Sequence, residues 1–499
     1  MSDPTPRPIR FFHQGQIQTV EGLPPTTTVL QWLREHAHCT GTKEGCAEGD
    51  CGACTVVVGE LDETGQALRK TTVNACIQFL PTLDGRALFT VEDLQSMNKG
   101  ALHPCQQAMV DCHGSQCGFC TPGFVMSLWQ VYEDQTRPLP RQDLADALSG
   151  NLCRCTGYRP ILDAGQTMFE APRVVFDPTP ALAALTALGQ SGGTFIHDAP
   201  EATDPGVRAR FVAPTTLAEL AQWRLHMPQA SLLAGSTDVG LWVTKQMRPL
   251  GDILYLGRVK ALKTITATRT GLDIGAGASL EYAWAAIVQH VPTLREIWLR
   301  FASPPVRHAG TLGGNIANGS PIGDSAPMLL ALNAEVTLRQ GPRERTLPLS
   351  SFYSDYMKNA LEPGEFLQSM HIPLPRTDDI VRGYKISKRR DSDISAVCAG
   401  LMIRLDGDVI AEARLAWGGM AATAKRAALT EAALVGQPWT EATLRRAQAA
   451  LSQDFKPMTD LRASQGYRSR VAANLLERFW LETRPEHALT AEKVQVWTA

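Results

Sequence analysis

The most distinctive residues of this chain are cysteines, and three of them lie on one short glycine-rich loop. Cys46, Cys51 and Cys54 fall within the segment GCAEGDCGACTV, and Cys76 follows further along. A gap of four residues, then a gap of two and a distant fourth cysteine is the ligand spacing of a plant-type [2Fe–2S] cluster. The alternative is a zinc site on the Cys51 and Cys54 pair, although a four-residue gap before such a pair is unusual for zinc. The spacing therefore predicts a loop for one-electron transfer.

The residues between these cysteines are small, as a loop wrapped around an inorganic core requires. We expect Gly45, Gly49 and Gly52 to adopt the positive φ angles that such a wrap demands. Ala47 and Ala53 leave room for the backbone to approach the core with its N–H groups directed at sulfur.

A second group of cysteines presents a choice. Five of them compete for four positions, because Cys112, Cys117 and Cys120 repeat the spacing of the first loop and Cys153 and Cys155 follow. Cys112 lies seven residues after Cys105 on one predicted helix, so both should pack on one face as small apolar residues. Cys153 and Cys155 lie in a turn, where packing gives no reason for a pair. We therefore predict Cys117, Cys120, Cys153 and Cys155 as ligands, and structural roles for Cys39, Cys105, Cys112 and Cys398.

The elements that position these thiols follow from local patterns. Residues 8–20 alternate and turn like a β-hairpin, and TTTVLQWLREHAH begins with a threonine cap and continues as a helical apolar stripe. Two β-branched runs after the loop, TVVVGELD and KTTVNACIQFL, are typical of strands. A small β-grasp-like sheet should therefore end near residue 90, and helical periodicity prevails from 91 to 170.

The rest of the chain divides by composition, and its 499 residues exceed what one core usually supports. Residues 171–205 are rich in Pro, Ala and Gly, which indicates a linker. A mixed α/β segment covers 206–378, and strands followed by a helical tail cover 383–499. The sequence predicts a multidomain α+β protein.

Charge and hydropathy exclude several classes of partner. The formal net charge is −2 and the basic residues are scattered, so neither nucleic acid nor an anionic membrane is expected as a partner. No apolar run is long enough to span a bilayer, and Pro and Asp occupy the N-terminus where a signal peptide needs an apolar core. We expect a cytoplasmic protein, a compartment in which clustered cysteines are more often metal ligands than disulfides.

Two glycine-rich stretches have the composition of a nucleotide site. In SLLAGSTDVGLWV an apolar strand breaks at Gly235, Ser236 and Thr237 before a helix, which offers N–H groups and hydroxyls to a pyrophosphate. An ordinary strand-to-helix turn is the alternative for this stretch alone. In SPPVRHAGTLGGNIANGSPIGDSAP the glycines allow close backbone approach and Asp324 can accept hydrogen bonds from ribityl hydroxyls, so the two stretches together favour FAD.

Longer motifs link these features to a known family. The segments CTGTKEGCAEGDCGACTV, HGSQCGFCTPG and NLCRCTGYRPI strongly resemble the xanthine dehydrogenase and aldehyde oxidase family of molybdenum hydroxylases. The resemblance implies a ferredoxin-like β-grasp domain at 1–90, a helical-bundle [2Fe–2S] domain at 91–170, an α/β FAD-binding domain at 206–378 and an α+β C-terminal flavoprotein subdomain at 383–499. The family's pattern of cluster ligands agrees with the two sets chosen above.

The same resemblance assigns FAD contacts to particular positions. They are Leu232, Leu233, Ala234, Gly235, Ser236, Thr237, Asp238, Val239, Phe301, Thr311, Leu312, Gly313, Gly314, Asn315, Asp324, Leu367 and Lys385. The chain departs from the family at Ser392, where the usual pair of acids is reduced to Asp391 and Asp393, and at His308, where Asn or Ser is common. The departures leave the flavin site intact but put nicotinamide access in doubt.

The family's molybdenum domain has no counterpart in these residues. The resemblance therefore implies the small subunit of a two-gene enzyme, with a molybdopterin-binding large subunit as partner in a heterotetramer of two small and two large subunits. Substrate chemistry, with no catalytic residue in this chain, would occur in that partner during oxidation of hypoxanthine or xanthine to urate. Electrons would then pass through two [2Fe–2S] clusters to FAD and on to NAD⁺.

Three alternatives stay open. The partner could instead act on aldehyde, nicotinate or CO, although such enzymes often keep their iron–sulfur and FAD parts on separate chains. The chain could also be an electron-transfer module that does not use NAD⁺. A zinc-scaffolded binding module is the simplest alternative.

Overall fold

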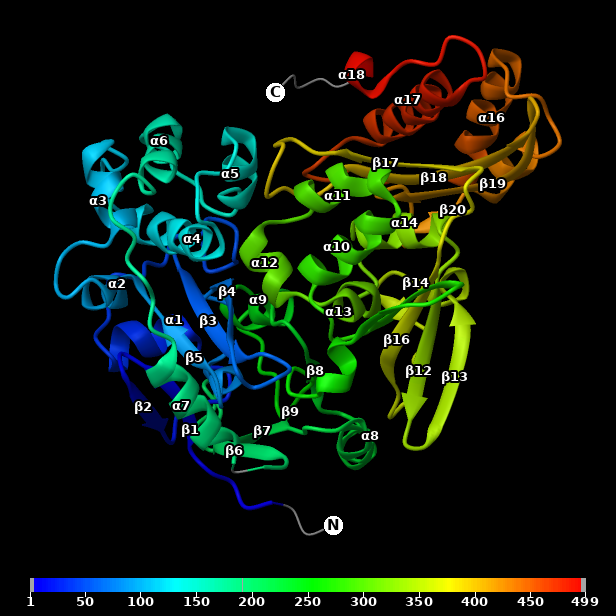
Figure 1. Cartoon of the computed structure of the whole chain (residues 1–499). Coiled ribbons are helices and arrows are strands. Elements are labelled where there is room, and N and C mark those ends of the chain that lie inside the picture. The colour runs from blue at the N-terminus through cyan, green and yellow to red at the C-terminus, as the bar shows by residue number, and fades with distance from the viewer. Residues whose placement is uncertain (1–3, 191, 495–499) are drawn as a thin grey trace. The chain divides into compact units, whose positions relative to one another are not determined.

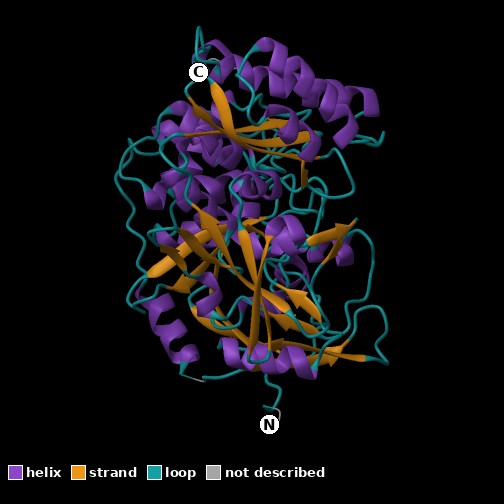
Figure 2. Ribbon diagram, turned by 90° about the vertical axis from the view of Figure 1, so that its right-hand side faces the viewer, coloured by secondary structure: helices purple, strands orange, loops and turns teal. Residues whose placement is uncertain are grey.

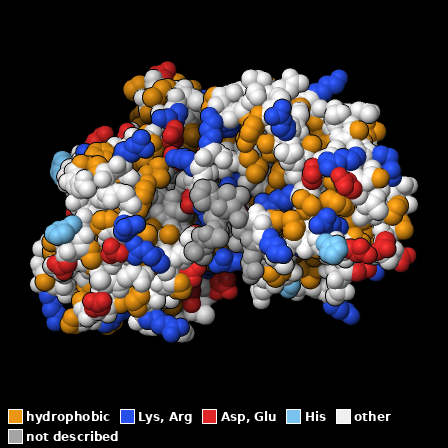
Figure 3. Space-filling model, turned by 90° about the horizontal axis from the view of Figure 1, so that it is seen from above, with side chains coloured by type: hydrophobic (Ala, Val, Ile, Leu, Met, Phe, Trp, Pro, Cys, Tyr) orange, Lys and Arg blue, Asp and Glu red, His pale blue; other side chains and the backbone are white. Residues whose placement is uncertain are grey.

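A computed structural model describes residues 4–190 and 192–494, which form two compact units (Figure 1). The first unit comprises Met1–Lys260 and Ser303–Gly310, and the second comprises Ala261–Ala302 and Thr311–Ala499. None of the helices in the described ranges is both long and apolar enough to cross a membrane. On the face seen in Figure 3, basic side chains are interspersed with acidic ones.

The N-terminal sheet has the predicted β-grasp character. A two-residue turn joins its first two strands, and Gln14 and Gly15 have φ angles of 49° and 78°, as a right-twisted hairpin favours. The first strand pairs in parallel with the last, and the other pairings are antiparallel in the order β2-β1-β5-β3-β4. The strands are β1 (Ile9–His13), β2 (Gln16–Val20), β3 (Thr55–Leu61), β4 (Leu68–Asn74) and β5 (Ala87–Phe89).

One short helix packs across this sheet. It begins at the predicted threonine cap, where Thr28 and Gln31 form a reciprocal capping box. Leu30 and Trp32 are buried in the same apolar core as Phe11 and Val56. The helical elements here are α1 (Val29–Gln31), the π-helical η1 (Trp32–His36) and the 3₁₀ turn η2 (Leu80–Leu83).

The predicted helical region after residue 90 contains α2 (Val91–Met97), α3 (Pro104–Asp111), α4 (Thr121–Asp134), α5 (Arg141–Ala147) and α6 (Arg159–Thr167). The central helix α4 is buried almost throughout, from Gly123 to Tyr132. Its apolar face joins Val57 and Phe89 of the sheet in one core. The helices therefore dock on the β-grasp sheet through α4.

The stretch 171–205, expected as a linker, contains the helix α7 (Thr179–Gly189) and the strand β6 (Phe195–Pro200). Ala181, Leu185 and Leu188 are buried at helical spacing, and the first two belong to the core around α4. Proline in the first turn of a helix is tolerated, and alanine is the best helix former. The Pro/Ala-rich segment therefore forms a helix with proline in its first turn, and it is not a continuous linker.

The remaining part of the first unit is a four-stranded sheet in the order β6-β7-β9-β8. Strands β7, β9 and β8 are parallel, so their carboxyl ends share one edge. Ligands of α/β sheets bind beyond such ends. The elements are β7 (Arg208–Ala213), α8 (Leu217–His226), β8 (Ser231–Leu233), α9 (Val239–Thr244), β9 (Ile253–Tyr255) and α12 (Pro304–Ala309).

The second unit contains an antiparallel sheet in the order β10-β11-β16-β12-β13 and helices packed on it. The boundary at residue 260 falls inside the segment predicted as one FAD-binding domain. The strands are β10 (Ile265–Ala267), β11 (Gly271–Gly275), β12 (Glu335–Gln340), β13 (Arg343–Pro348) and β16 (Phe366–Pro373), with a small ribbon of β14 (Tyr353–Asp355) and β15 (Lys358–Asn359). The helices are η3 (Lys260–Lys263), α10 (Leu280–His290), η4 (Pro292–Leu294), α11 (Arg295–Arg300), α13 (Leu312–Ala317), α14 (Ser325–Ala331) and η5 (Leu349–Ser351).

A second sheet of this unit, β17-β18-β19-β20, is covered by helices on both faces (Figure 2). Side chains of β18 alternate between two cores: Cys398 and Met402 pack with α14, whereas Val397 and Leu401 pack with the C-terminal helices. The elements are β17 (Asp379–Ile386), β18 (Val397–Asp406), β19 (Val409–Gly418), β20 (Lys425–Arg426), α15 (Ala428–Leu434), α16 (Glu441–Asp454), α17 (Gln465–Thr483) and α18 (Ala491–Val494).

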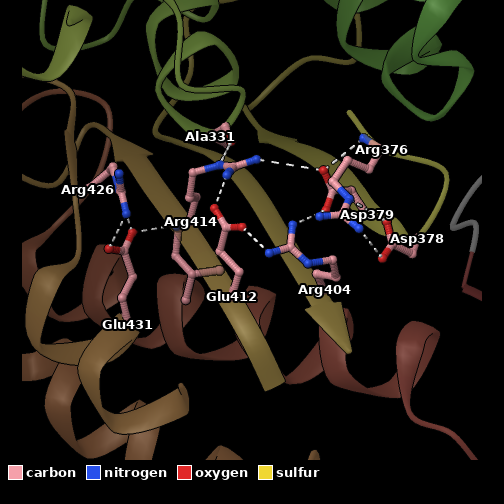
Figure 4. A network of polar contacts seen from close by, with 10 residues as sticks. Ala331, Arg376, Asp378, Asp379, Arg404, Glu412, Arg414, Arg426 and Glu431 are labelled. Carbon is pink, nitrogen blue, oxygen red and sulfur yellow. Dashed lines mark hydrogen bonds and ion pairs between the residues drawn. The ribbon is translucent and has the colours of Figure 1, made fainter. Parts of the chain in front are cut away.

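Ion pairs tie the strands of this sheet together (Figure 4). Arg404 on β18 contacts Asp379 on β17 at 3.1 Å and Glu412 on β19 at 2.6 Å. Arg414 also pairs with Glu412, and its Nε donates to the carbonyl of Ala331 on α14 at 2.7 Å. The network joins three strands to the helix that covers them.

Candidate functional site

The four cysteines of the first thiol set, Cys46, Cys51, Cys54 and Cys76, meet at one end of the β-grasp sheet. The loop before β3 carries three of them, and the fourth follows β4, the antiparallel neighbour of β3. The Cys46 side chain lies near those of Cys51 and Cys76, and the Cys54 side chain lies near that of Cys76, close enough for each to shift the pKa of its neighbour. Residues separated by up to 30 positions along the chain are therefore brought together at one site.

The donor set around these sulfurs fits an iron–sulfur cluster. The backbone N–H of Cys51 donates to the sulfur of Cys46 at 3.4 Å, and Asn74 Nδ2 lies 3.9 Å from that of Cys54. Contacts with the Cys51 and Cys76 sulfurs, together with backbone donors, lower the pKa of the Cys46 thiol. Among the described residues, no three or more Cys, His, Asp or Glu side chains are arranged around a single metal ion. A [2Fe–2S] cluster instead takes its cysteines in pairs, two at each iron.

The loop geometry differs from the prediction at one glycine. Gly49 and Gly52 have the expected positive φ angles, 79° and 71°, but the third residue in this region is Ala47, at 54°, and not Gly45. A Cβ at Gly45 would lie 2.9 Å from the sulfur of Cys51. Gly45 is therefore required for close approach of the chain to a sulfur and not for a left-handed backbone.

The second thiol set, Cys117, Cys120, Cys153 and Cys155, pairs the start of α4 with the loop before α6. The Cys120 side chain lies near that of Cys153, and the Cys117 side chain lies near that of Cys155. Burial and the neighbouring Cys153 raise the pKa of the Cys120 thiol, and the neighbouring Cys117 raises the pKa of the Cys155 thiol. Thr156 donates to the Cys153 sulfur from its hydroxyl at 3.2 Å. Cys117 and Cys155 are exposed, so this set lies at the surface of the first unit.

The sulfurs of the remaining cysteines have other neighbours in the described structure. Cys105 is fully buried with its sulfur 3.7 Å from that of Met168, and the sulfur of Cys112 lies 3.4 Å from the Thr167 hydroxyl. Both thus face α6, as expected for two residues on one helix face. Burial also raises the pKa of the Cys398 thiol in β18.

The loops of the two thiol sets contact each other directly. The N–H of Leu152 donates to the carbonyl of Cys51 at 2.9 Å, and Asn151 Nδ2 donates to the carbonyl of Gly52 at 3.0 Å. A Cβ at Gly52 would lie 2.1 Å from the Gly150 carbonyl oxygen, and one at Gly123 would lie 2.1 Å from that of Gly52. Sequence reasoning did not single out Asn151, since a polar residue beside a cysteine pair carries no signal of its distant partner.

The flavin loop, defined as residues 232–239, begins in β8 and ends at the first residue of α9, in the first unit. A Cβ at Gly235 would lie 1.9 Å from the carbonyl oxygen of Ala309, so only glycine fits against α12. Ser236 has a φ of 64°, and its hydroxyl donates to the carbonyl of Ile77 at 2.6 Å. The flavin loop thus contacts the residue that follows Cys76.

The other predicted FAD residues lie in the second unit, at 301, 311–315, 324, 367 and 385. Phe301 and Leu367 belong to the buried core around α13. The hydroxyl of Thr311 caps that helix by accepting from the N–H of Gly314 at 3.0 Å. Asn315 Oδ1 is buried and has no hydrogen-bond partner in the described structure. An acceptor left in this state fits a ligand hydroxyl or amide, because buried polar atoms are normally paired.

Both carboxylate oxygens of Asp324 accept hydrogen bonds from protein side chains, which the sequence did not predict. Its Oδ2 accepts from Lys385 Nζ at 2.6 Å and its Oδ1 from the Ser395 hydroxyl at 2.5 Å. The Asp324 and Lys385 side chains are only 5% and 1% exposed. Each carboxylate oxygen keeps a second lone pair, so the carboxylate can accept from a ligand and also hold the lysine.

The two residues that depart from the family pattern, His308 and Ser392, both make hydrogen-bond contacts with other parts of the protein. His308, on α12, contacts the Thr72 hydroxyl at 3.1 Å, which places it against β4. The carbonyl of Ser392 accepts from the Arg389 guanidinium at 2.5 Å, and Asp393 accepts from the Arg389 N–H at 2.7 Å. Ser392 itself has a φ of 48°. Arg389, Ser392 and Asp393 lie in the turn between β17 and β18.

Comparison with known proteins agrees with this arrangement. Four family models match in succession: a 2Fe-2S iron-sulfur cluster binding domain at 11–80, a [2Fe-2S] binding domain at 90–166, a FAD binding domain in molybdopterin dehydrogenase at 207–375 and a CO dehydrogenase flavoprotein C-terminal domain at 382–483. The chain thus binds two [2Fe–2S] clusters and FAD, and the predicted fold class is confirmed.

Curated relatives match nearly the whole chain. A xanthine dehydrogenase from Drosophila subobscura is 33% identical over 88% of this chain and 36% of its own length. Aldehyde oxidase 4 from Cavia porcellus is 30% identical over 95% of this chain and 39% of its own length. The chain therefore spans little more than a third of the length of these relatives.

Solved structures match a shorter part. The carbon monoxide dehydrogenase from Hydrogenophaga pseudoflava is 26% identical, with a TM-score of 0.51 over 54% of this chain and 94% of the matched one. Reconstituted CO dehydrogenase from Oligotropha carboxidovorans gives 25% identity and a TM-score of 0.51 over 53% of this chain and 94% of the matched one. With four domain matches in the order of the chain and relatives along almost all of it, the protein belongs to the xanthine dehydrogenase and aldehyde oxidase family.

Proposed function

We propose that this chain is the iron–sulfur and FAD subunit of a xanthine dehydrogenase. In this proposal the first and second thiol sets each ligate one [2Fe–2S] cluster, and the flavin loop, Thr311–Asn315, Phe301, Asp324, Leu367 and Lys385 bind FAD. When bound, the clusters supply one-electron transfer, and FAD supplies the two-electron exchange with NAD⁺. The domain limits given by the sequence, 1–90, 91–170, 206–378 and 383–499, and a cytoplasmic location are part of the same proposal.

The observation that carries the proposal is a continuous set of contacts within the first unit. The backbone N–H of Leu152, the residue before Cys153, donates to the carbonyl of Cys51. On the other side of the first thiol set, Ser236 of the flavin loop donates to the carbonyl of Ile77. The order of contact is second thiol set, first thiol set, flavin loop. It matches the order in which electrons would travel in the family that the sequence resembles.

The residues of this chain hold and orient the redox groups. The β3–β4 pairing fixes three thiols of the first set relative to the fourth, and the N–H of Cys51 donates to the Cys46 sulfur, which stabilises that thiolate. In the second unit the Asp324–Lys385 pair is buried, so its charges stay in place without reorganisation when a ligand binds. None of these groups is suited to activate a purine. Substrate oxidation is therefore proposed for a molybdopterin-binding partner, in a heterotetramer of two small and two large subunits.

The choice of xanthine rests on the relatives' names and on the fusion of iron–sulfur and flavin domains in one chain. The aldehyde oxidase match, at 30% identity against 33%, keeps an aldehyde substrate as a second candidate. The substrate would be recognised by the partner, so residues of this chain do not decide between them.

Co-expression with the partner subunit tests the proposal. The purified complex should reduce NAD⁺ with xanthine as donor, and this chain alone should oxidise NADH with an artificial acceptor but leave xanthine unchanged. Turnover of an aldehyde, nicotinate or CO in place of xanthine would reject the purine assignment. Reduction of a dye without reduction of NAD⁺ would identify an electron-transfer module with another acceptor.

A further inference from the structure

Helix α9 connects the flavin loop at its start to the first thiol set at its end, and all these residues lie in the first unit. The Thr244 hydroxyl donates to the carbonyl of Ala47 at 2.7 Å, and Lys245 Nζ donates to the carbonyl of Cys46 at 2.8 Å. The same ammonium lies 3.6 Å from Glu48. A cation is thus bound to the peptide of a proposed cluster ligand.

Near its N-terminal end, α9 also packs closely against the segment that follows Cys76. A Cβ at Gly240 would lie 2.6 Å from the carbonyl oxygen of Ile77, the residue after Cys76. Helix α9 and its C-cap residue therefore contact the peptide of Cys46 and the residue that follows Cys76. This packing fixes where the Lys245 ammonium can lie relative to the sulfurs.

A positive charge at this position favours the reduced cluster. Reduction of a [2Fe–2S] cluster adds one negative charge, and the potential depends on net charge and hydrogen bonding around it. The ammonium stabilises the added charge, whereas the carboxylate of Glu48 opposes it. Lys245 and Glu48 are 44% and 41% exposed, so water and salt screen both effects.

We propose that Lys245 is a positioning residue that raises the reduction potential of the cluster held by the first thiol set. Through α9 it also holds that set against the flavin loop. The inference rests on the proposed function only in requiring that Cys46, Cys51, Cys54 and Cys76 ligate a cluster. At the screening expected for exposed charges, loss of the ammonium should change the reduction equilibrium of that cluster roughly threefold.

The test is a redox titration of the full, cofactor-loaded chain, followed by electron paramagnetic resonance of the two clusters. Lys245→Met should make the potential of the first cluster more negative and shift that of the second cluster less. Lys245→Arg should restore the potential, because it keeps the charge and a donor. Lys245→Gln keeps a donor without the charge, so it should resemble Lys245→Met. Glu48→Gln should shift the potential in the opposite direction.

A control removes the same charge elsewhere in the first unit. Arg208, on β7, is 60% exposed and pairs with Asp198 at 2.8 Å, so Arg208→Met matches the change in net charge. The inference predicts an unchanged potential for this variant and a Lys245→Met shift that shrinks at high salt. Equal potentials for Lys245→Met and Arg208→Met would overturn it. Loaded wild-type protein without a paramagnetic cluster signal on reduction would overturn the proposed function itself, and the inference with it.

Discussion

Gly52 lies where the loops of the two thiol sets cross, and we predict that Gly52→Ala separates them. An added Cβ would lie 2.1 Å from the Gly150 carbonyl oxygen and 2.7 Å from Asn151 Nδ2. A φ of 71° is also unfavourable for alanine. The left-handed conformation costs about 1–2 kcal/mol, and forcing an atom into a packed site costs about 1–3 kcal/mol. Together they predict about 2–5 kcal/mol of destabilisation of the first unit.

A matched control separates the cost of the left-handed backbone from the cost of the steric clash. Gly65 has a φ of 72° but nothing within 4 Å of an added Cβ, so Gly65→Ala should cost only the conformational term, about 1–2 kcal/mol. Urea unfolding of each variant, followed by circular dichroism, gives the two losses. The magnetic coupling between the two reduced clusters should weaken in Gly52→Ala and stay unchanged in Gly65→Ala. Equal destabilisation by both substitutions would refute the argument from close approach.

Three further predictions concern the proposed ligands. Cys112→Ser should keep both cluster signals whereas Cys155→Ser should lose that of the second cluster, and loss in Cys112→Ser instead would show that the ligands were misassigned. Asn315→Leu removes a buried acceptor without a protein partner, so it should stabilise the apoprotein but weaken FAD binding by about 1–3 kcal/mol in a flavin titration; unchanged flavin affinity would remove Asn315 from the site. Lys385→Met leaves the buried Asp324 carboxylate unpaired and should destabilise the protein by about 3–5 kcal/mol, and the double variant with Asp324→Leu should recover part of this loss in thermal unfolding.

The elements defined by local chemistry were predictable from the sequence. The turn at Gln14 and Gly15 and the capping box at Thr28 and Gln31 use neighbours along the chain, so residue type alone predicts them. The fold class followed from such elements together with the cysteine spacing, and the comparisons confirm it. The ligand positions themselves stay a prediction.

The contacts between distant segments were not predictable in the same way. Lys245 and Cys46 are 199 positions apart in the sequence, and Asn151 and Gly52 are 99 apart, yet each pair is hydrogen-bonded. Residue type alone does not predict either contact. Composition also misled at 179–189, where buried alanine and leucine form a helix within an apparent linker. The role of Gly45 depends on the distance to a sulfur and not on φ, which only the folded loop reveals.

In the proposed function, this chain accepts electrons from a molybdopterin subunit and delivers them to its flavin. The most direct measurement is the flavin absorbance of this chain under anaerobic conditions after addition of xanthine, with and without the partner subunit. We expect xanthine to leave the flavin of the isolated chain oxidised and to bleach the flavin of the complex, and we expect NAD⁺ then to restore the absorbance. Bleaching by xanthine in the absence of the partner, or a complex that turns over xanthine while the flavin stays oxidised, would contradict the proposed function.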